Sequence, residues 1–208
     1  MPWGETDVVS WSVSDEDGFH VIRWSAPDRA NALDADDWDR LAATIESVPA
    51  GVPLLLEGAG RWFSAGFDRR EWERLDDPGR RTALAAVNRA LAAVRRHPGL
   101  TVARVRGAVA GGALALMLET DWQILAAPTV MTCPMQRMGV VPSPRFVAQL
   151  AAAVGWGGVR RLLVGEARMG AACALPGFFA DRLPSTDTTP VALVLRQSWP
   201  EDGMLRLF

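Results

Sequence analysis

The chain of 208 residues contains no lysine and no tyrosine, and all 22 of its basic residues are arginine. The absence of lysine excludes a lysine Schiff base or a lysine general base from its chemistry. Only two cysteines are present, Cys133 and Cys173, and their separation is not a metal-binding spacing. We therefore expect both thiols to be buried and reduced in a cytoplasmic protein.

A strong net charge and a long hydrophobic run are also lacking. The formal net charge of -2 gives no reason to expect nucleic acid or an anionic membrane as a partner. The longest apolar run, residues 108–118, is too short to span a bilayer and stops at Glu119 and Asp121. The first residues include Glu5 and Asp7 and no apolar segment, so we do not expect a signal peptide.

The hydrophobic pattern predicts strands that alternate with helices. Residues 7–13 and 19–25 alternate apolar and polar positions around a turn, which predicts a hairpin. Further strands are expected at 52–56, 100–105, 122–126 and 129–133, and helices at 35–48, 68–75, 84–94, 108–118, 146–154 and 159–164, with a break at 77–79. This order is typical of α/β units joined by right-handed crossovers.

Two glycine-bearing turns, residues 60–68 and 107–115, carry the main functional signal. Each follows an apolar run of strand type and leads into a helical pattern. Such a turn leaves backbone N–H groups free at a helix start, where the helix dipole also favours negative charge. Two turns of this kind that face each other would form an oxyanion hole, which stabilises an enolate or a tetrahedral thioester intermediate.

The order of several short motifs resembles the crotonase (enoyl-CoA hydratase/isomerase) superfamily over residues 8–183. The motifs are Arg-Ala-Asn-Ala-Leu at 29–33, Phe-Ser-Ala-Gly-Phe-Asp at 63–68, 107–112 with Asp121, Met-Gly-Val-Val-Pro at 138–142, Gly155, 165–166 and 180–183. The resemblance implies an α/β fold with a core of repeated β-β-α units. We expect one domain, residues 1–184, followed by a short tail, 185–208, in place of the family's full C-terminal helical region.

The resemblance also implies a binding site for an acyl-CoA thioester, as substrate or ligand, with no covalently bound cofactor and no metal. The backbone N–H groups of Phe67 and Gly112 correspond to the oxyanion hole. Arg29 and Ala65 correspond to coenzyme A-binding positions, and an arginine fork suits a phosphate contact. For Arg29, a solvated loop arginine is the alternative interpretation.

The two glutamates that hydratases of this family use are replaced here. By position they correspond to Ala115 and Met135, and neither side chain can carry a proton. The carboxylate nucleophile of dehalogenase-type members corresponds to Ser143, which lies between two prolines and is interpreted as a turn residue. Ordinary hydration is therefore not supported.

Two other residues are candidates for the missing chemistry. Glu119 lies one helical turn beyond Ala115 and on the same face, but it also suits a structural cap or ion pair. Cys133 faces the same side of an extended strand as Met135, and it is either a site thiol or a packed core residue. A serine hydrolase using Ser64 is disfavoured because Trp62 stands where a nucleophile elbow needs glycine.

Two functional hypotheses follow. In the first, the chain is an acyl-CoA enzyme that relies mainly on its oxyanion hole, for decarboxylation, thioester cleavage or isomerisation. In the second, it is a catalytically reduced accessory subunit that supports a partner acyl-CoA or polyketide-type biosynthetic enzyme. Apolar surface left without the usual C-terminal helices predicts a homo-oligomer, or a hetero-oligomer with another acyl-CoA-using or crotonase-like protein.

Overall fold

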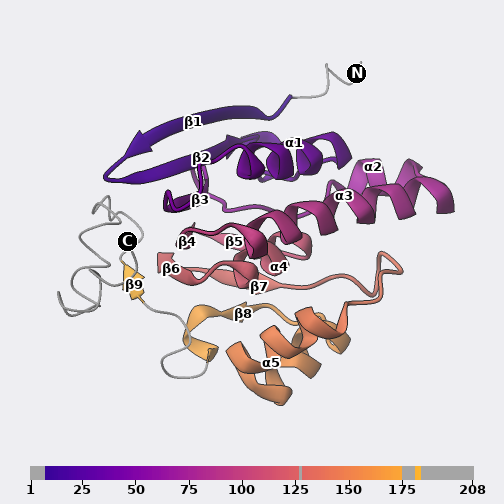
Figure 1. The fold of residues 1–208 in the computed structure, drawn as a ribbon. Helices are drawn as coiled ribbons and strands as arrows, with labels where there is room; N and C mark the ends of the chain where they lie inside the picture. Colours follow the sequence, from indigo (N-terminus) through magenta and orange to yellow (C-terminus); the bar gives the residue numbers. More distant parts are fainter. Residues whose placement is uncertain (1–7, 127, 175–180, 184–208) are drawn as a thin grey trace.

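The computed structural model describes residues 8–126, 128–174 and 181–183 (Figure 1). The chain begins with an antiparallel hairpin of β1 (Ser10–Glu16) and β2 (Phe19–Ser25). Asp17 and Gly18 form its turn, both with positive φ, of 52° and 84°. The expected hairpin is confirmed, with its first strand shifted toward the turn.

A six-stranded sheet extends from this hairpin in the order β1-β2-β3-β4-β6-β9. The strands β3 (Leu54–Gly58), β4 (Thr101–Val105), β6 (Trp122–Ala126) and β9 (Asp181–Leu183) join it in parallel. Thr101, at the start of β4, donates from its backbone N and its hydroxyl to the carboxylate of Asp121, at 2.8 and 2.7 Å. Asp121 therefore supports the sheet.

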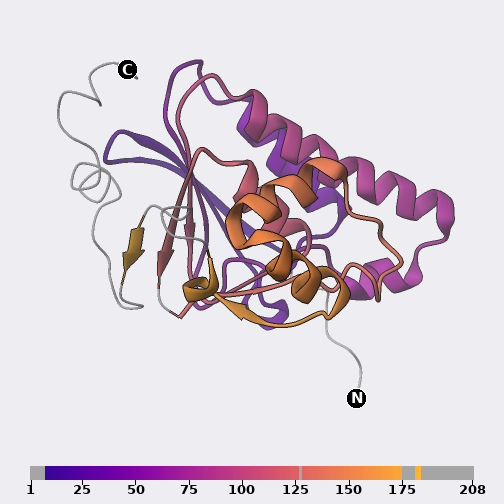
Figure 2. The same ribbon diagram turned by 90° about the horizontal axis from the view of Figure 1, so that it is seen from below.

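Helices connect the parallel strands and cover one face of the sheet. After a short 3-10 turn at Pro27–Arg29, α1 (Ala35–Glu46) leads from β2 to β3. Asp34 caps α1, and together with Asp37 it forms a reciprocal capping box. Then α2 (Arg69–Arg74) and α3 (Asp77–Arg96) lead to β4. Figure 2 shows α1 and α3 side by side on the same side of the sheet.

The helix α3 runs through the break expected at 77–79. Asp76 caps it by accepting a hydrogen bond from the Gly79 N–H at 2.8 Å, and Pro78 lies within its first turn. A proline is tolerated there because the first N–H groups of a helix have no intrahelical acceptor. The expected division into two helices is confirmed, but the break lies at residues 75–76 rather than 77–79, because Pro78 begins a helix rather than ending one.

A second, smaller sheet contains β5 (Ala108–Ala110), β7 (Val130–Thr132) and β8 (Met169–Gly170). The apolar helix expected over 108–118 begins later, as α4 (Gly112–Glu119), because residues 108–110 form β5. Beyond β7, α5 (Pro144–Val159) contains a non-helical residue at Gly155 and continues into a π-helical turn, Arg160–Val164, with a 3-10 turn at Ala171–Cys173 after β8. Ser143 caps α5 by accepting a hydrogen bond from Phe146 N at 3.2 Å.

The main core lies between the six-stranded sheet and the helices, and it includes nearly all of α4. On β3, Leu54 and Leu56 face this core, while Leu55 joins a second cluster with Phe19, Val21, Val102 and Ile124. Alternate residues of a strand point to opposite faces. The sheet is therefore apolar on both sides, as the continuous hydrophobic run at 52–56 predicts.

The α/β fold with a crotonase-like core is confirmed, as the comparisons below establish. The boundary between core and tail stays a prediction, because residues 184–208 lie outside the described part of the chain. None of the described helices combines the length and the hydropathy needed to cross a membrane.

Candidate functional site

The two glycine turns lie side by side. A parallel bridge joins Ser64 to Val109, and the Ala110 N–H donates to the Ser64 carbonyl at 3.1 Å. Gly66 has φ of 86°, and a Cβ built on it would lie 2.5 Å from the Ala110 oxygen and 3.1 Å from the Gly112 nitrogen. Only glycine allows this approach, since any side chain at position 66 would collide with the second turn.

The N–H groups of Phe67 and Gly112 both lie where these turns meet. Leu33 forms a parallel bridge with Phe67 by bonding to the residues on either side of Phe67. The Leu33 N–H donates to the Gly66 carbonyl at 2.9 Å, and the Asp68 N–H donates to the Leu33 carbonyl at 2.8 Å. In a parallel bridge of this kind the N–H of Phe67 points away from Leu33. Gly112 is the first residue of α4, so its N–H has no acceptor within the helix. Neither the bridge nor the helix therefore uses these two N–H groups.

The side chain of Ser64 is fully used within the first turn. Its hydroxyl donates to the Asn31 carbonyl at 2.6 Å and accepts from the Gly66 N–H at 3.0 Å, and the residue is completely buried. Asn31 in turn donates from its amide to the Trp62 carbonyl at 2.6 Å. Ser64 thus shapes the turn and has no exposed hydroxyl for nucleophilic attack. Ala65 lies exposed on the same turn, with its N–H bonded to the Ala30 carbonyl.

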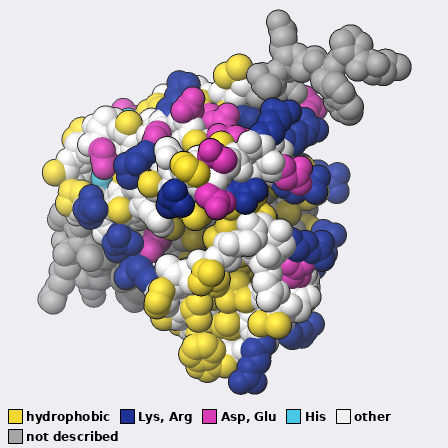
Figure 3. Space-filling view, turned by 90° about the vertical axis from the view of Figure 1, so that its right-hand side faces the viewer, with side chains coloured by type: hydrophobic (Ala, Val, Ile, Leu, Met, Phe, Trp, Pro, Cys, Tyr) yellow, Lys and Arg dark blue, Asp and Glu magenta, His cyan; other side chains and the backbone are white. Residues whose placement is uncertain are grey.

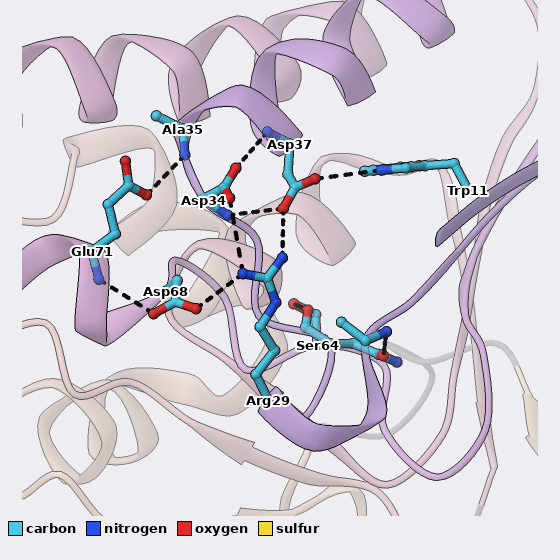
Figure 4. A network of polar contacts seen from close by, with 10 residues as sticks. Trp11, Arg29, Asp34, Ala35, Asp37, Ser64, Asp68 and Glu71 are labelled. Atoms are coloured by element: carbon cyan, nitrogen blue, oxygen red, sulfur yellow. Dashed lines mark hydrogen bonds and ion pairs between the residues drawn. The ribbon is translucent and has the colours of Figure 1, made fainter. Parts of the chain in front are cut away.

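Arg29 lies at the centre of a cluster of carboxylates (Figure 4). Its two terminal nitrogens contact Asp37 at 2.9 Å and Asp68 at 3.2 Å, and Asp34 lies 3.9 Å away. Its side chain is only 16% exposed, so the guanidinium faces the protein rather than solvent. The interpretation of Arg29 as a solvated loop arginine is therefore wrong. The coenzyme A phosphate contact that the resemblance implies would have to compete with these carboxylates.

The same cluster contains a further acid that the sequence motifs did not indicate. Glu71, in α2, accepts a hydrogen bond from the Ala35 N–H at 3.0 Å (Figure 4). Burial, and then the nearby charge of Asp34, raises the pKa of Glu71. Burial likewise raises the pKa of Asp37. The signal for Glu71 is its spacing from Asp68, which caps α2 through the N–H groups of Arg70 and Glu71.

The two turns carry apolar side chains that pack into or against the main core. Ala115 is buried, and Phe67 and Met135 are partly buried against the main core. The ring of Phe67 packs edge-on against Trp72, with the centroids 5.7 Å apart. Trp72 also donates from its indole N–H to the Met138 carbonyl at 3.0 Å. This bond joins α2 to the segment that carries Met135, beside the first turn.

Glu119 is held by two arginines rather than directed at a ligand. Its side chain is only 4% exposed, and it pairs with Arg95 at 3.2 Å and with Arg145 at 2.8 Å. These contacts join the ends of α3 and α4 to the start of α5. The ion-pair interpretation of Glu119 is therefore confirmed.

The two cysteines differ in environment. Cys133 is fully buried, and burial raises the pKa of its thiol to about 12. A thiol with so high a pKa is a poor nucleophile at neutral pH, which favours the core-residue interpretation. Cys173 is exposed, so the expectation that both thiols are buried was wrong for it. Its apolar flanks in the sequence conceal that it lies in a short 3-10 turn at the surface.

The two histidines of the chain have structural partners. His20 contacts Asp15 at 2.8 Å, and His97, at the end of α3, contacts the Val52 carbonyl at 2.8 Å. Within the described ranges, no three His, Cys, Asp or Glu side chains are close enough together to hold a metal ion.

A model of the enoyl-CoA hydratase/isomerase family matches residues 14–189 of this chain. The chain belongs to this family. The two glycine turns, the Arg29 cluster and the segment carrying Met135 all lie within the matched residues.

Curated relatives share about a quarter of their residues with this family member. Ethylmalonyl-CoA decarboxylase of Mus musculus is 26% identical over 97% of this chain and 62% of its own length. A probable enoyl-CoA hydratase of Bacillus subtilis is 27% identical over 86% of this chain and 80% of its own. The chain spans 53–65% of the length of three ethylmalonyl-CoA decarboxylases, from mouse, cattle and rat.

Solved structures of the family share the fold. DspI of Pseudomonas aeruginosa superposes with a TM-score of 0.78 at 24% identity, over 95% of this chain and 77% of DspI. An enoyl-CoA hydratase/carnithine racemase of Magnetospirillum magneticum superposes with a TM-score of 0.74 at 24% identity, over 90% of this chain and 72% of its own. These likenesses establish the crotonase fold of the chain.

Substitution of Gly66 tests the close approach of the two turns. We expect Gly66→Ala to cost about 3 kcal/mol of unfolding free energy, because the new Cβ meets the Ala110 oxygen and the backbone keeps a positive φ. Gly18→Ala is the matched control, since Gly18 has a φ of 84° and open space around it. It should cost only about 1 kcal/mol. If urea unfolding showed that both variants lose the same unfolding free energy, the two turns would not constrain each other.

Substitution of Arg29 tests its structural role. Arg29→Met leaves Asp37 and Asp68 buried without their cation, and we expect a loss of about 2–3 kcal/mol of unfolding free energy, measured in urea. Arg89→Met breaks the exposed pair of Arg89 with Asp39 and should cost less than about 1 kcal/mol. An Arg29 variant of unchanged stability that binds coenzyme A more weakly would instead make Arg29 a phosphate ligand.

Thiol labelling tests the environments of the cysteines. With iodoacetamide at pH 8, the native protein should take up one label, at Cys173, because the Cys133 thiol is buried and stays protonated. A second label should appear only in denaturant, as mass spectrometry of the peptides would show. Rapid labelling of Cys133 in the native protein would restore it as a candidate site thiol.

Proposed function

We propose that this family member binds an acyl-CoA thioester and polarises its carbonyl through the N–H groups of Phe67 and Gly112. One observation carries the proposal: Gly66 allows the two turns to touch, so that both donors lie at their meeting point. The Leu33–Phe67 bridge does not use the N–H of Phe67, and the N–H of Gly112 has no acceptor within α4 because Gly112 is the first residue of that helix. Two fixed donors of this kind stabilise the negative oxygen of an enolate.

The side chains around the donors argue against hydration. Adding water across a double bond needs a group that delivers a proton and one that activates water, and Ala115 and Met135 supply neither. Glu119 is held by Arg95 and Arg145. The surroundings are apolar, which strengthens hydrogen bonds from the backbone donors to a charged oxygen.

Decarboxylation of a malonyl-type thioester makes the smallest demand on such a site. The bond between the α-carbon and the carboxylate breaks, CO2 leaves, and its electron pair forms the enolate that the two N–H groups stabilise. A proton from solvent then restores the α-carbon. No protein base is needed to form the enolate, and several of the similar proteins are ethylmalonyl-CoA decarboxylases. Thioester cleavage and isomerisation pass through comparable oxyanions.

An accessory role is the second candidate. Val141, Trp156 and Val164 are 89%, 64% and 68% exposed, and hydrophobic side chains gather over the α5 region in Figure 3. Exposed apolar groups of this kind are typical of protein interfaces. We infer an oligomer, with copies of this chain or with another acyl-CoA-using protein. In this role the site would bind a thioester without turnover.

Removal of one backbone donor tests the proposal. Gly112→Pro deletes the N–H at a helix position where proline is tolerated, and Gly112→Ala keeps the N–H while adding a Cβ near Trp38. We expect Gly112→Pro to release CO2 from ethylmalonyl-CoA 100- to 1000-fold more slowly than Gly112→Ala, about 3–4 kcal/mol of transition-state stabilisation.

Calorimetry with butyryl-CoA separates the two candidates. Binding without turnover of any malonyl-type thioester would favour the accessory role. If the unmodified protein bound no thioester, or if the proline and alanine variants behaved alike, the proposed use of the Gly112 N–H would fail.

A further inference from the structure

A cavity of about 490 Å³ lies near the start of the two glycine turns, away from the donors of Phe67 and Gly112. Its wall includes residues 60–62 of the first turn and 106–108 of the second. Pro128 and Val130, just after β6, and Arg168, just before β8, complete it. A volume of this size suits a small organic molecule.

Among the described residues that line this cavity there are three arginines and no acidic residue. They are Arg61, Arg106 and Arg168, which come from three separate segments of the chain. Arg29, Arg89 and Arg145, elsewhere in the chain, each pair with a carboxylate. By contrast, no carboxylate of the described residues lies within ion-pairing distance of Arg61 or Arg168. The cavity wall thus carries positive charge that its own lining does not neutralise.

The backbone brings these arginines together. Phe63 N donates to the Arg106 carbonyl at 2.8 Å, and a Cβ on Gly107 would lie 2.1 Å from the Arg61 carbonyl. The segments that carry Arg61 and Arg106 are therefore in contact, and a positive φ of 62° at Gly107 permits it. Pairing of β5 with β7 and of β7 with β8 brings Arg168 to the same end of the small sheet.

The rest of the wall is apolar. The guanidinium carbon of Arg61 lies over the indole ring of Trp62, 4.4 Å from the ring centroid. Aliphatic surface comes from Ala108, Ala126, Pro128 and Val130. An arginine stacked on an aromatic ring keeps its N–H groups in the ring plane free to bind an anion. The cavity therefore offers cations and hydrophobic contacts together.

We propose that this cavity is a second ligand site, which binds a small phosphorylated molecule with an apolar part. Guanidinium groups donate paired hydrogen bonds that match phosphate oxygens. The apolar wall contacts the organic portion of the ligand. Neither Phe67 nor Gly112 lines the cavity, so its occupant does not use the thioester donors.

Titration calorimetry with phenyl phosphate and with inorganic phosphate tests the site in the unmodified protein. We expect phenyl phosphate to bind at least tenfold more tightly, because only its ring contacts the apolar wall. Arg61→Gln and Arg168→Gln should each lower the affinity for phenyl phosphate about tenfold. Arg81→Gln is the matched control, since Arg81 is exposed on α3 and does not line the cavity. It should change the affinity less than twofold.

Three results would overturn the proposal. The first is that phenyl phosphate does not bind at millimolar concentration. The second is that the Arg81 and Arg168 variants lose equal amounts of affinity for phenyl phosphate. The third is that saturating butyryl-CoA displaces phenyl phosphate. The last result would assign the cavity to the thioester site. Both substituted cavity arginines are exposed, and circular dichroism will verify that the variants fold. Failure of thioester binding in a separate titration would count only against the proposed function.

Discussion

The contact between the two glycine turns is the constraint on which the rest of the site depends. Position 66 has a positive φ and no room for a Cβ, so the first turn can lie directly against the second. The bridge between Ser64 and Val109 then aligns them, and the buried hydroxyl of Ser64 fixes the first turn to Asn31. Close packing of backbone on backbone leaves little freedom to either turn. The N–H groups at their ends are therefore held in place before any ligand arrives.

The same arrangement places unlike environments at the two ends of the paired turns. At one end, the ring of Phe67 packs against Trp72, and Phe67 and Met135 are partly buried against the main core. At the other end, Arg61 and Arg106 bring positive charge to a cavity. Backbone donors in an apolar site favour a ligand with a developing negative oxygen, whereas guanidinium groups favour a fully charged anion. The two proposed anion sites thus lie at opposite ends of one structural unit.

Carboxylates around Arg29 form the support behind this unit. Asp68 both caps α2 and pairs with Arg29, while Asp37 closes the capping box of α1 and pairs with the same guanidinium. A single side chain therefore joins the starts of two helices that flank the first turn. Raised pKa values of Asp37 and Glu71 show that burial disfavours the charge gathered there. Arg29 offsets part of this cost, which is why its charge is directed inward.

The sequence by itself determined the hairpin and the alternation of strands and helices, because these depend on local patterns and short-range hydrogen bonds. The motif order also determined the family. Local signals failed at Pro78, which can either end a helix or begin one, since that choice depends on the cap that Asp76 provides. Only the tertiary structure decided the inward direction of Arg29 and Glu71, the pairing of Glu119 and the grouping of Arg61 with Arg168. These contacts join residues far apart in the chain, and only packing of the sheets and helices determines which charged groups meet.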